Sequence, residues 1–269
     1  MDGSEIRNPQ QQMSTARLFR VRVSGRRQLS ENMVRISFTG DDLRHFVAAG
    51  PDQRVKLILS TDGRSAPALN PGMTPRDILA MPEDQRPVMR TYTIRSHRPE
   101  VGEVDIDFAL HGDTTGPASR WAQVCAEGWE VAIFGPVSAY APPSPSVTQL
   151  IAGDETALPA IGAIVEQLPA GTYADVLVEV ATAGDKQQLS TAADVHIRWL
   201  IRDVKASASG ELLAAAVESV AAQRTYEYAW VACESATAAA IRRHLVERVG
   251  LSKSSIYFSG YWRIGSAVG

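Results

Sequence analysis

The hydrophobic rhythm of the chain changes near residues 141–145, and this change constrains the fold more than any other feature. Before it, apolar and polar residues alternate, as in the run containing Val104, Ile106 and Phe108. Such period-two alternation is typical of strands with one buried face. After the Pro-rich segment APPSP at 141–145, apolar runs of strand length alternate with helical segments. The sequence therefore predicts two domains of different architecture, joined at this linker.

The first half, residues 16–141, is predicted to be a small antiparallel β-barrel. One predicted helix begins at Pro117 and is followed by Gly128, the residues expected at the two ends of a helix. The stretch from Ser60 to Pro87 is predicted to be loop or short helix. Short strands in this number are typical of a barrel; they are predicted around residues 19–23, 34–38, 55–59, 89–96, 103–111 and 129–134.

The second half, residues 142–269, is predicted to be an α/β domain with a doubly wound parallel sheet, because its strands and helices alternate. The predicted strands cover residues 147–152, 173–180, 195–201, 226–232 and 255–261. The predicted helices cover residues 158–167, 211–222 and 237–249. Residues 1–15 are polar and aperiodic and are predicted to form a flexible tail.

The composition argues against several classes of function. The chain has 27 basic and 30 acidic residues, a net charge of −3, which provides no electrostatic footprint for nucleic acid or an anionic membrane. No apolar run approaches about 18 residues and no signal peptide is recognisable, so we expect a cytoplasmic protein without membrane insertion. Cys125 and Cys233 lie far apart, and the histidines lack metal-ligand spacing, so no protein-held metal is expected. The motifs of common dinucleotide-binding proteins, P-loop enzymes, zinc proteases and serine hydrolases are also missing.

The segment RTYTIR at 90–95 combines cations, an aromatic ring and hydroxyl groups on one strand. Alternation places Arg90 and Tyr92 on one face and Thr91, Thr93 and Arg95 on the other. Arginine can hold a pyrophosphate, tyrosine can stack on a flat ring, and threonine can hydrogen-bond the ring or ribityl chain of a flavin. The alternative for this segment alone is an edge strand with solvated arginines.

A second segment, Gly116–Trp121, opens the predicted helix shortly after His111. Free N–H groups and the positive end of the helix dipole can seat a phosphate at such a position. An ordinary helix cap is the alternative for this segment alone. Together, in a barrel that precedes an α/β domain, the two segments favour a flavin site.

Four segments of the chain resemble the siderophore-interacting protein family, a group of ferric-siderophore reductases within the ferredoxin–NADP reductase-like superfamily. They are RTYTIR at 90–95, DFALHGDTTGPASRWA at 107–122, AGDETALPAIGAIVEQLP at 152–169 and GYWRIG at 260–265. The resemblance runs from about Ala16 to the C-terminus. It implies an FAD-binding barrel, an NAD(P)H-binding-like domain, and reduction of Fe(III) in a siderophore complex so that iron is released.

The resemblance also implies which residues contact the cofactors. For the flavin they are Arg90, Tyr92, Thr93, Arg95, Ala109, His111, Gly116, Ala118, Ser119 and Trp121. In the α/β domain the loop after the first strand is expected to face the cofactor crevice; its residues are Asp154, Glu155, Thr156 and Ala157. This acidic loop stands where dinucleotide-binding domains have a glycine-rich loop. The sequence therefore supports NADPH or NADH binding less strongly than FAD binding.

Two cations are predicted to bind the ferric siderophore, which is often anionic. Lys56 lies on the polar face of a barrel strand, and Arg263 follows Tyr261 and Trp262 near the C-terminus. Their alternatives are a solvated lysine and a cap on the last strand. Arg202 and Lys205 are weaker candidates for contacting the 2′-phosphate of NADPH, and Cys233 is predicted to be buried and inert.

Two other functions stay open at this point. A flavin reductase of the same superfamily could act on another acceptor, and ferredoxin could replace NAD(P)H as the electron donor. A non-catalytic siderophore-binding module would need the basic residues but not the segments at 90–95 and 116–119, which argue against it.

Overall fold

The computed structural model describes residues 16–70, 72–110, 116–202 and 209–265. It contains two compact units, the first ending at Ala139 and the second beginning at Tyr140. The predicted tail 1–15, His111 and Lys205 lie outside the described residues.

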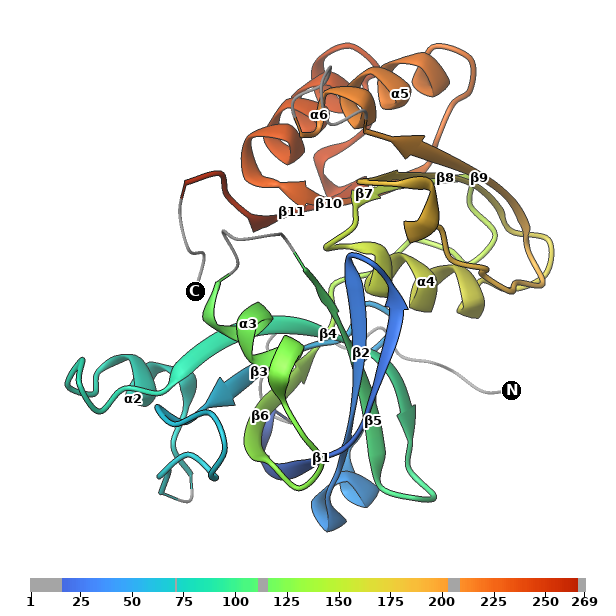
Figure 1. Cartoon of the computed structure of the whole chain (residues 1–269). Helices are drawn as coiled ribbons and strands as arrows, with labels where there is room; N and C mark the ends of the chain where they lie inside the picture. The colour runs from blue at the N-terminus through green and yellow to red at the C-terminus, as the bar shows by residue number, and fades with distance from the viewer. Residues whose placement is uncertain (1–15, 71, 111–115, 203–208, 266–269) are drawn as a thin grey trace. The chain divides into compact units, whose positions relative to one another are not determined.

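The first unit is a closed antiparallel barrel with the strand order β1-β2-β5-β4-β3-β6 (Figure 1). Its strands are β1 (Arg17–Ser30), β2 (Met33–Thr39), β3 (Arg54–Leu59), β4 (Val88–Arg98), β5 (Glu103–Ala109) and β6 (Glu130–Val137). Three short elements complete it: η1 (Asp41–His45), α2 (Pro75–Leu79) and α3 (Pro117–Val124). This confirms the predicted barrel.

The barrel core follows directly from the alternation in the sequence. Val104, Ile106 and Phe108 are fully buried on the inner face of β5. On the outer face, Asp107 accepts two hydrogen bonds from the Arg35 guanidinium at 2.6 and 2.8 Å. Closing the sheet in this way gives every strand two partners and leaves no exposed edge.

The second unit is a parallel sheet with the order β11-β10-β7-β8-β9. Its strands are β7 (Gln149–Asp154), β8 (Tyr173–Val180), β9 (Asp194–Ile201), β10 (Tyr228–Glu234) and β11 (Ile256–Trp262). Helix α4 (Leu158–Gln167) covers one face, and α5 (Glu211–Ala221) and α6 (Ser235–Glu247) cover the other; η3 (Ala183–Asp185) and η4 (Lys253–Ser255) are single turns (Figure 1). The predicted doubly wound sheet is confirmed.

The strand order reverses between β7 and β10, which are adjacent although they are far apart in sequence. In open α/β sheets, ligands bind beyond the carboxyl ends of the strands at such a switch point. The loop at 154–157 follows β7 and therefore lies at this position. Gly153, just before it, pairs with Ala232 of β10 and Val178 of β8.

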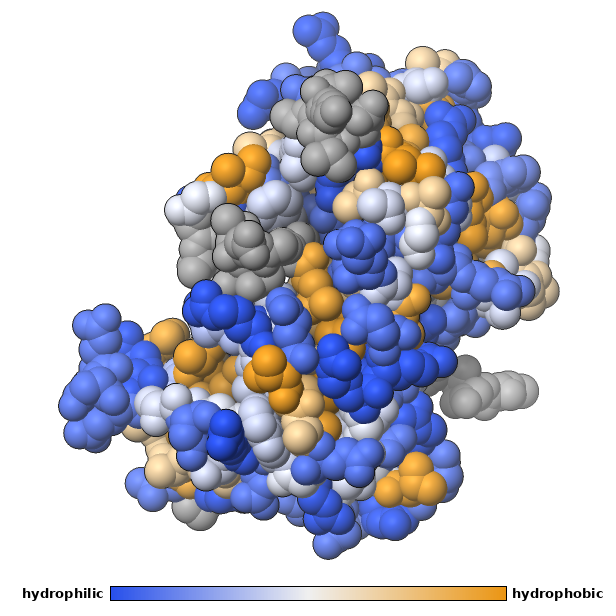
Figure 2. Space-filling view, viewed as in Figure 1, coloured by the Kyte–Doolittle hydropathy of each residue, from blue (hydrophilic) through white to orange (hydrophobic). Residues whose placement is uncertain are grey.

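The surface seen in Figure 2 is largely hydrophilic, with apolar side chains gathered in small patches. Within the described residues, no helix combines the length and apolar character needed to cross a bilayer.

Gly153→Ala tests the close packing at the switch point. An added Cβ would lie 2.5 Å from the Ala232 carbonyl oxygen and 2.7 Å from the Ala157 Cβ. Because backbone cannot move aside cheaply, we expect the free energy of unfolding to fall by about 2 kcal/mol or more. The matched control is Gly184→Ala, whose Cβ would meet only the Thr182 hydroxyl at 3.6 Å. Urea unfolding measures both; equal stability of the two variants would contradict this packing.

Candidate functional site

Strand β4 presents Arg90 and Tyr92 on one face, as predicted. In the β3–β4 pairing they stand opposite Leu57 and Val55, which belong to the barrel core. The Tyr92 ring packs against Phe108 with ring centroids 4.3 Å apart. Burial raises the pKa of the Tyr92 phenol, so the ring stays neutral over the physiological range.

The opposite face of β4 carries Thr91 and Thr93, which stand opposite Lys56 and Arg54 of β3. Thr93 is buried, whereas Thr91 is exposed. The pairing of β4 with β5 shifts register between Ile94 and Ser96. The predicted alternation therefore does not continue to Arg95, because an irregularity in the ladder interrupts it there.

The N-terminus of helix α3 has backbone N–H groups that no side chain caps. Its N-cap residue, Gly116, is extended and exposed and provides no side-chain cap, and the first turn contains no acidic residue. Pro117 occupies the first helical position, where its missing N–H costs nothing. The Ser119 hydroxyl donates to the Ala109 carbonyl oxygen at 3.1 Å, which fixes the helix start against the end of β5.

The donor set on this part of the barrel fits the diphosphate of FAD. Among the described residues, Arg90 has no carboxylate within ion-pair distance; one of its Nη atoms donates to the Met89 carbonyl oxygen at 2.8 Å. Helix α3 packs against both β4 and β5, so its free N–H groups belong to the same part of the barrel. A guanidinium and an uncapped helix start, with no acidic residue in the first turn of α3, suit a doubly charged phosphate group.

Two residues predicted to contact the flavin, Trp121 and Ala118, are buried in the barrel core. Trp121 is buried; its indole N–H donates to the Gly63 carbonyl oxygen at 2.5 Å, and its ring stacks on Phe38. Ala118 is also buried in this cluster. The indole therefore anchors the loop after β3 to α3, and contact of either residue with the flavin stays a prediction.

In the α/β unit, Asp154 is a buried carboxylate at the carboxyl end of β7. One oxygen accepts from the Thr156 backbone and hydroxyl at 3.0 and 2.5 Å. The other accepts from the Glu234 backbone at 3.0 Å and from the Trp262 indole at 2.7 Å. Asp154 therefore ties β7 to the ends of β10 and β11. Burial, with the nearby Glu155 charge, raises its pKa to about 6 despite these donors.

Glu155 and Arg202 form an ion pair. This pairing competes with the contact predicted between Arg202 and the 2′-phosphate of NADPH. The two side chains meet at 2.5 Å, and a second contact of 3.1 Å joins Arg202 to the buried carboxylate of Glu179. A guanidinium held by two carboxylates is not available for the 2′-phosphate of NADPH. The sequence did not indicate this because Glu179 and Arg202 lie on different strands and loops.

The loop at 154–157 is consequently a poor phosphate seat. Ala157, the N-cap of α4, is fully buried, and Pro159 removes one N–H from the first turn. Glu234 is the N-cap of α6, accepting from the Ala236 and Thr237 backbone, and adds another buried carboxylate. Acidic groups at a switch point repel a dinucleotide phosphate. The cofactor role of residues 154–157 stays a prediction.

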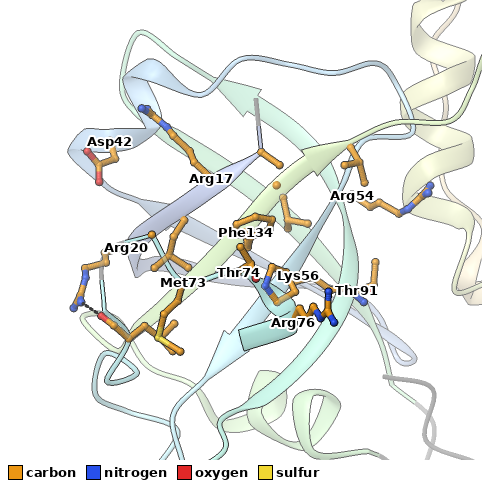
Figure 3. Close-up of a pocket in the computed structure, with 18 residues that line it drawn as sticks. Arg17, Arg20, Asp42, Arg54, Lys56, Met73, Thr74, Arg76, Thr91 and Phe134 are labelled. Atoms are coloured by element: carbon orange, nitrogen blue, oxygen red, sulfur yellow. Dashed lines mark hydrogen bonds between the residues drawn. The ribbon is translucent and has the colours of Figure 1, made fainter. Parts of the chain in front are cut away.

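The two predicted substrate cations belong to different units. Lys56 lines a cavity on the barrel (Figure 3), and burial, followed by the charges of Arg54 and Arg90, lowers its pKa. Arg263 is exposed directly after β11, next to Trp262, whose carbonyl oxygen accepts from the Ser235 hydroxyl at 2.8 Å. Their convergence on one substrate stays a prediction. Cys233 is fully buried, and burial raises its pKa, as expected for an inert thiol.

Asp154→Asn tests the link at the switch point. The amide N–H₂ would face N–H donors, so we expect a loss of about 1–3 kcal/mol in the free energy of unfolding. Because the Asp154 pKa is raised from 3.8 to about 6, the folded state binds the extra proton between these values. The stability contributed by Asp154 therefore increases as pH falls from about 6 to about 4, and the variant lacks that increase.

Urea unfolding at about pH 5 and about pH 7.5 measures both effects. The stability gap between wild type and variant should be wider at the lower pH. Asp84→Asn, at an exposed carboxylate before β4, is the control and should leave no such gap. Parallel pH profiles of wild type and Asp154→Asn would contradict the raised pKa.

Comparisons with known proteins agree with this geometry. Residues 22–140 match the siderophore-interacting FAD-binding domain, and residues 147–265 match the siderophore-interacting protein family. Ferric vibriobactin reductase ViuB of Vibrio cholerae is 31% identical over 242 residues, covering 89% of this chain and 87% of that protein. The ferric acinetobactin reductase of Acinetobacter baumannii is 31% identical, covering 72% of this chain and 68% of the relative.

Solved structures of siderophore-related proteins also resemble this chain. The siderophore-interacting protein SipS from Aeromonas hydrophila superposes with a TM-score of 0.75 at 32% identity, covering 93% of both chains. A siderophore utilization protein from T. fusca superposes with a TM-score of 0.79 at 26% identity, covering 94% of this chain and 95% of that one. The chain therefore belongs to the siderophore-interacting protein family, and it is an FAD-dependent oxidoreductase.

Proposed function

We propose that this protein uses FAD to reduce Fe(III) held by a siderophore, so that Fe(II) is released. The proposal rests on one observation. The barrel carries groups that can bind an anion, because Arg90 and Tyr92 share a face of β4 and helix α3, which packs against β4, begins without a side-chain cap. FAD, when bound, supplies the electron-transfer chemistry that no side chain can provide. The reductases among the relatives support iron in a siderophore as the acceptor.

Each part of the barrel has a separate role in holding the cofactor. The Arg90 guanidinium and the backbone N–H groups of Gly116, Ala118 and Ser119 hold the diphosphate, and Tyr92 provides a flat, neutral surface for the ring. Thr93 offers a hydroxyl on the other face of β4. Arg95 is kept as a further candidate contact, and Ala109, at the end of β5, limits the space beside the ribityl chain.

Reduction itself is enough to loosen the iron. Siderophore oxygens are hard ligands that hold Fe(III) far better than Fe(II). The protein therefore needs to position the chelate but does not need to coordinate the metal. Within the part of the chain that the structure describes, no group of three His, Cys, Asp or Glu side chains could hold a metal ion.

The electron donor is proposed to be NADPH or NADH, with ferredoxin as the alternative. The 2′-phosphate contact proposed for Arg202 is dropped because Glu155 and Glu179 hold this side chain. A pyridine nucleotide would instead have to bind without a phosphate seat at the start of α4. Reduced ferredoxin requires no such seat, so both donors enter the test.

The test is an absorbance spectrum of the FAD-loaded protein, followed by anaerobic addition of NADPH, NADH or reduced ferredoxin. We expect flavin bands that bleach with one donor and recover when a ferric siderophore is added. Bleaching that recovers only with another acceptor would favour a different flavin reductase. Failure to bind FAD on reconstitution would contradict the proposal and favour a siderophore-binding module.

Arg90→Ala should weaken FAD binding by about tenfold or more, because a charge-assisted contact to phosphate is worth about 1.5–3 kcal/mol. Fluorescence titration of the apoprotein with FAD measures this. Arg27→Ala removes the same charge from an exposed site on β1 and serves as the control. If both variants bind FAD equally well, Arg90 does not hold the diphosphate.

Combined replacement of Lys56 and Arg263 by alanine tests the substrate cations. We expect KM for the ferric siderophore to rise by about tenfold or more while FAD stays bound, because two charges that would pair with an anion are removed. Steady-state kinetics with a fixed donor measures the change. Unchanged KM and kcat in the double variant would exclude this pair.

A further inference from the structure

Strand β9 forms one edge of the parallel sheet (Figure 1), and among the described strands it pairs only with β8. The Asp194 amide donates to the Thr172 carbonyl oxygen at 2.9 Å. The Arg202 amide donates to the Val180 carbonyl oxygen at 2.9 Å. Because backbone groups alternate in direction along a strand, the even-numbered residues of β9 face β8 and the odd-numbered ones present their N–H and C=O groups outward. The outward residues are Val195, Ile197, Trp199 and Ile201.

The two faces of β9 differ in character. Arg198 stands opposite Leu177 of β8, which belongs to the core cluster under α5. The side chains of Asp194, His196 and Arg198 therefore lie on the α5 side of the sheet, and all three residues are exposed. The other face carries apolar side chains that the single chain leaves only half-buried; these are Val195, Ile197 and Trp199.

Strand β9 has few of the features that keep an edge strand from pairing with another chain. Proteins block such edges with proline, bulges or charged side chains. Residues 194–201 contain neither proline nor glycine, and the pairing with β8 runs along the whole strand without a register shift. The other edge strand, β11, contains Gly260 and a register shift in its pairing with β10. The charges on β9 are thus its main protection, and their order determines which strand can pair with it.

The order of these charges complements a second copy of β9 in antiparallel orientation. With a two-fold axis at His196, Asp194 lies opposite Arg198 of the second copy, and Arg198 opposite Asp194. Because these residues are even-numbered, they form non-hydrogen-bonded pairs, in which side chains approach each other closely. Within the single chain, Asp194 contacts His196 at 3.5 Å, and Arg198 forms no ion pair among the described residues.

The neighbouring register fits less well. An axis at Ile197 would place His196 opposite Arg198 and Asp194 opposite Leu200, so that neither formal charge meets its opposite. The axis at His196 also sets Val195 opposite Ile197 of the second copy, and these two outward residues would exchange backbone hydrogen bonds. Charge and hydrogen bonding therefore favour the same register.

The α5 side of this edge also has space for the side chains of an added strand. A groove of about 410 Å³ lies there, lined by His196 and Arg198 of β9, Asp175 of β8 and Val220 of α5. The Asp194 and His196 side chains are 70% and 61% exposed. They can therefore change rotamer toward a second strand without disturbing the core.

We propose that two copies of this chain associate through β9, in antiparallel register about a two-fold axis at His196, so that their sheets become continuous. The same strand serves on both sides, as in an isologous interface. Pairing satisfies the outward N–H and C=O groups of Val195 and Ile197 and covers part of the half-buried apolar face. Because the contact is limited to two short strands, the dimer is reversible and forms at micromolar concentration.

Charge reversal tests the register. Arg198→Asp sets an aspartate opposite Asp194 of the second copy, and Asp194→Arg sets an arginine opposite Arg198. We expect each variant alone to dimerise about tenfold more weakly or worse than wild type, because like charges face each other twice. An equal mixture of the two variants restores both opposite-charge pairs and should dimerise as wild type does. Sedimentation velocity of the full chain over a concentration series measures this.

Cross-linking tests the position of the axis. In a non-hydrogen-bonded pair the Cα atoms are about 4.5 Å apart, within the range of a disulfide. His196→Cys should therefore form a disulfide-linked dimer under mild oxidation. Arg198→Cys is the matched control, because the two copies of position 198 would lie about 13 Å apart along the strands. Both native cysteines are buried, so they add little background.

Arg243→Asp reverses an exposed arginine on α6 of the same unit and should leave dimerisation unchanged. A wild-type chain that stays monomeric throughout the micromolar range would overturn the inference. A dimer that Arg198→Asp and Arg243→Asp weaken equally, or a mixture of the two β9 variants that stays monomeric, would overturn it as well. Circular dichroism of each variant shows whether it is folded, and the mixture reports on β9 only if both are.

Discussion

The antiparallel pairing of β3 with β4 is the constraint on which the functional part of the barrel depends. The register sets Val55 opposite Tyr92 and Lys56 opposite Thr91. Because side chains alternate across a strand, a slip of one residue would exchange the two faces of β4. It would turn Arg90 and Tyr92 toward the cavity and bury Thr91 in the core. The burial of Val55 on the core face prevents such a slip, so packing in the barrel also fixes which residues can hold the flavin.

The Asp154 carboxylate has a comparable role in the parallel sheet. It joins the ends of strands that are distant in sequence, accepting from Glu234 after β10 and from Trp262 at the end of β11. The two sequence segments at 152–169 and 260–265 are therefore parts of one hydrogen-bonded unit. Arg263, which follows Trp262 directly, takes its position from this link. The acidic loop is explained by strand positioning, and a nucleotide contact is not needed to account for it.

The sequence predicted the fold well because the fold rests on short-range periodicity. The alternation of Val104, Ile106 and Phe108 identifies β5 without any knowledge of its neighbours. The second half of β1 escaped prediction because Arg26, Arg27 and Gln28 interrupt that alternation. The site was less predictable because its contacts are long-range. The Trp121 indole donates a hydrogen bond to Gly63, and the Arg202 guanidinium donates to Glu155 and Glu179. These contacts depend on tertiary structure, which local sequence spacing does not indicate.

Charge divides the two units by function more clearly than any motif does. The barrel gathers basic side chains around the cavity and at Arg90, whereas the switch point of the sheet gathers the buried carboxylates of Asp154, Glu155 and Glu234. An anion gains free energy at the first location and loses it at the second. We therefore expect the anionic FAD diphosphate to be held by the barrel. We expect an electron donor that enters at the switch point to be recognised by groups other than its phosphates, because the side chains of Asp154, Glu155 and Glu234 there are all carboxylates.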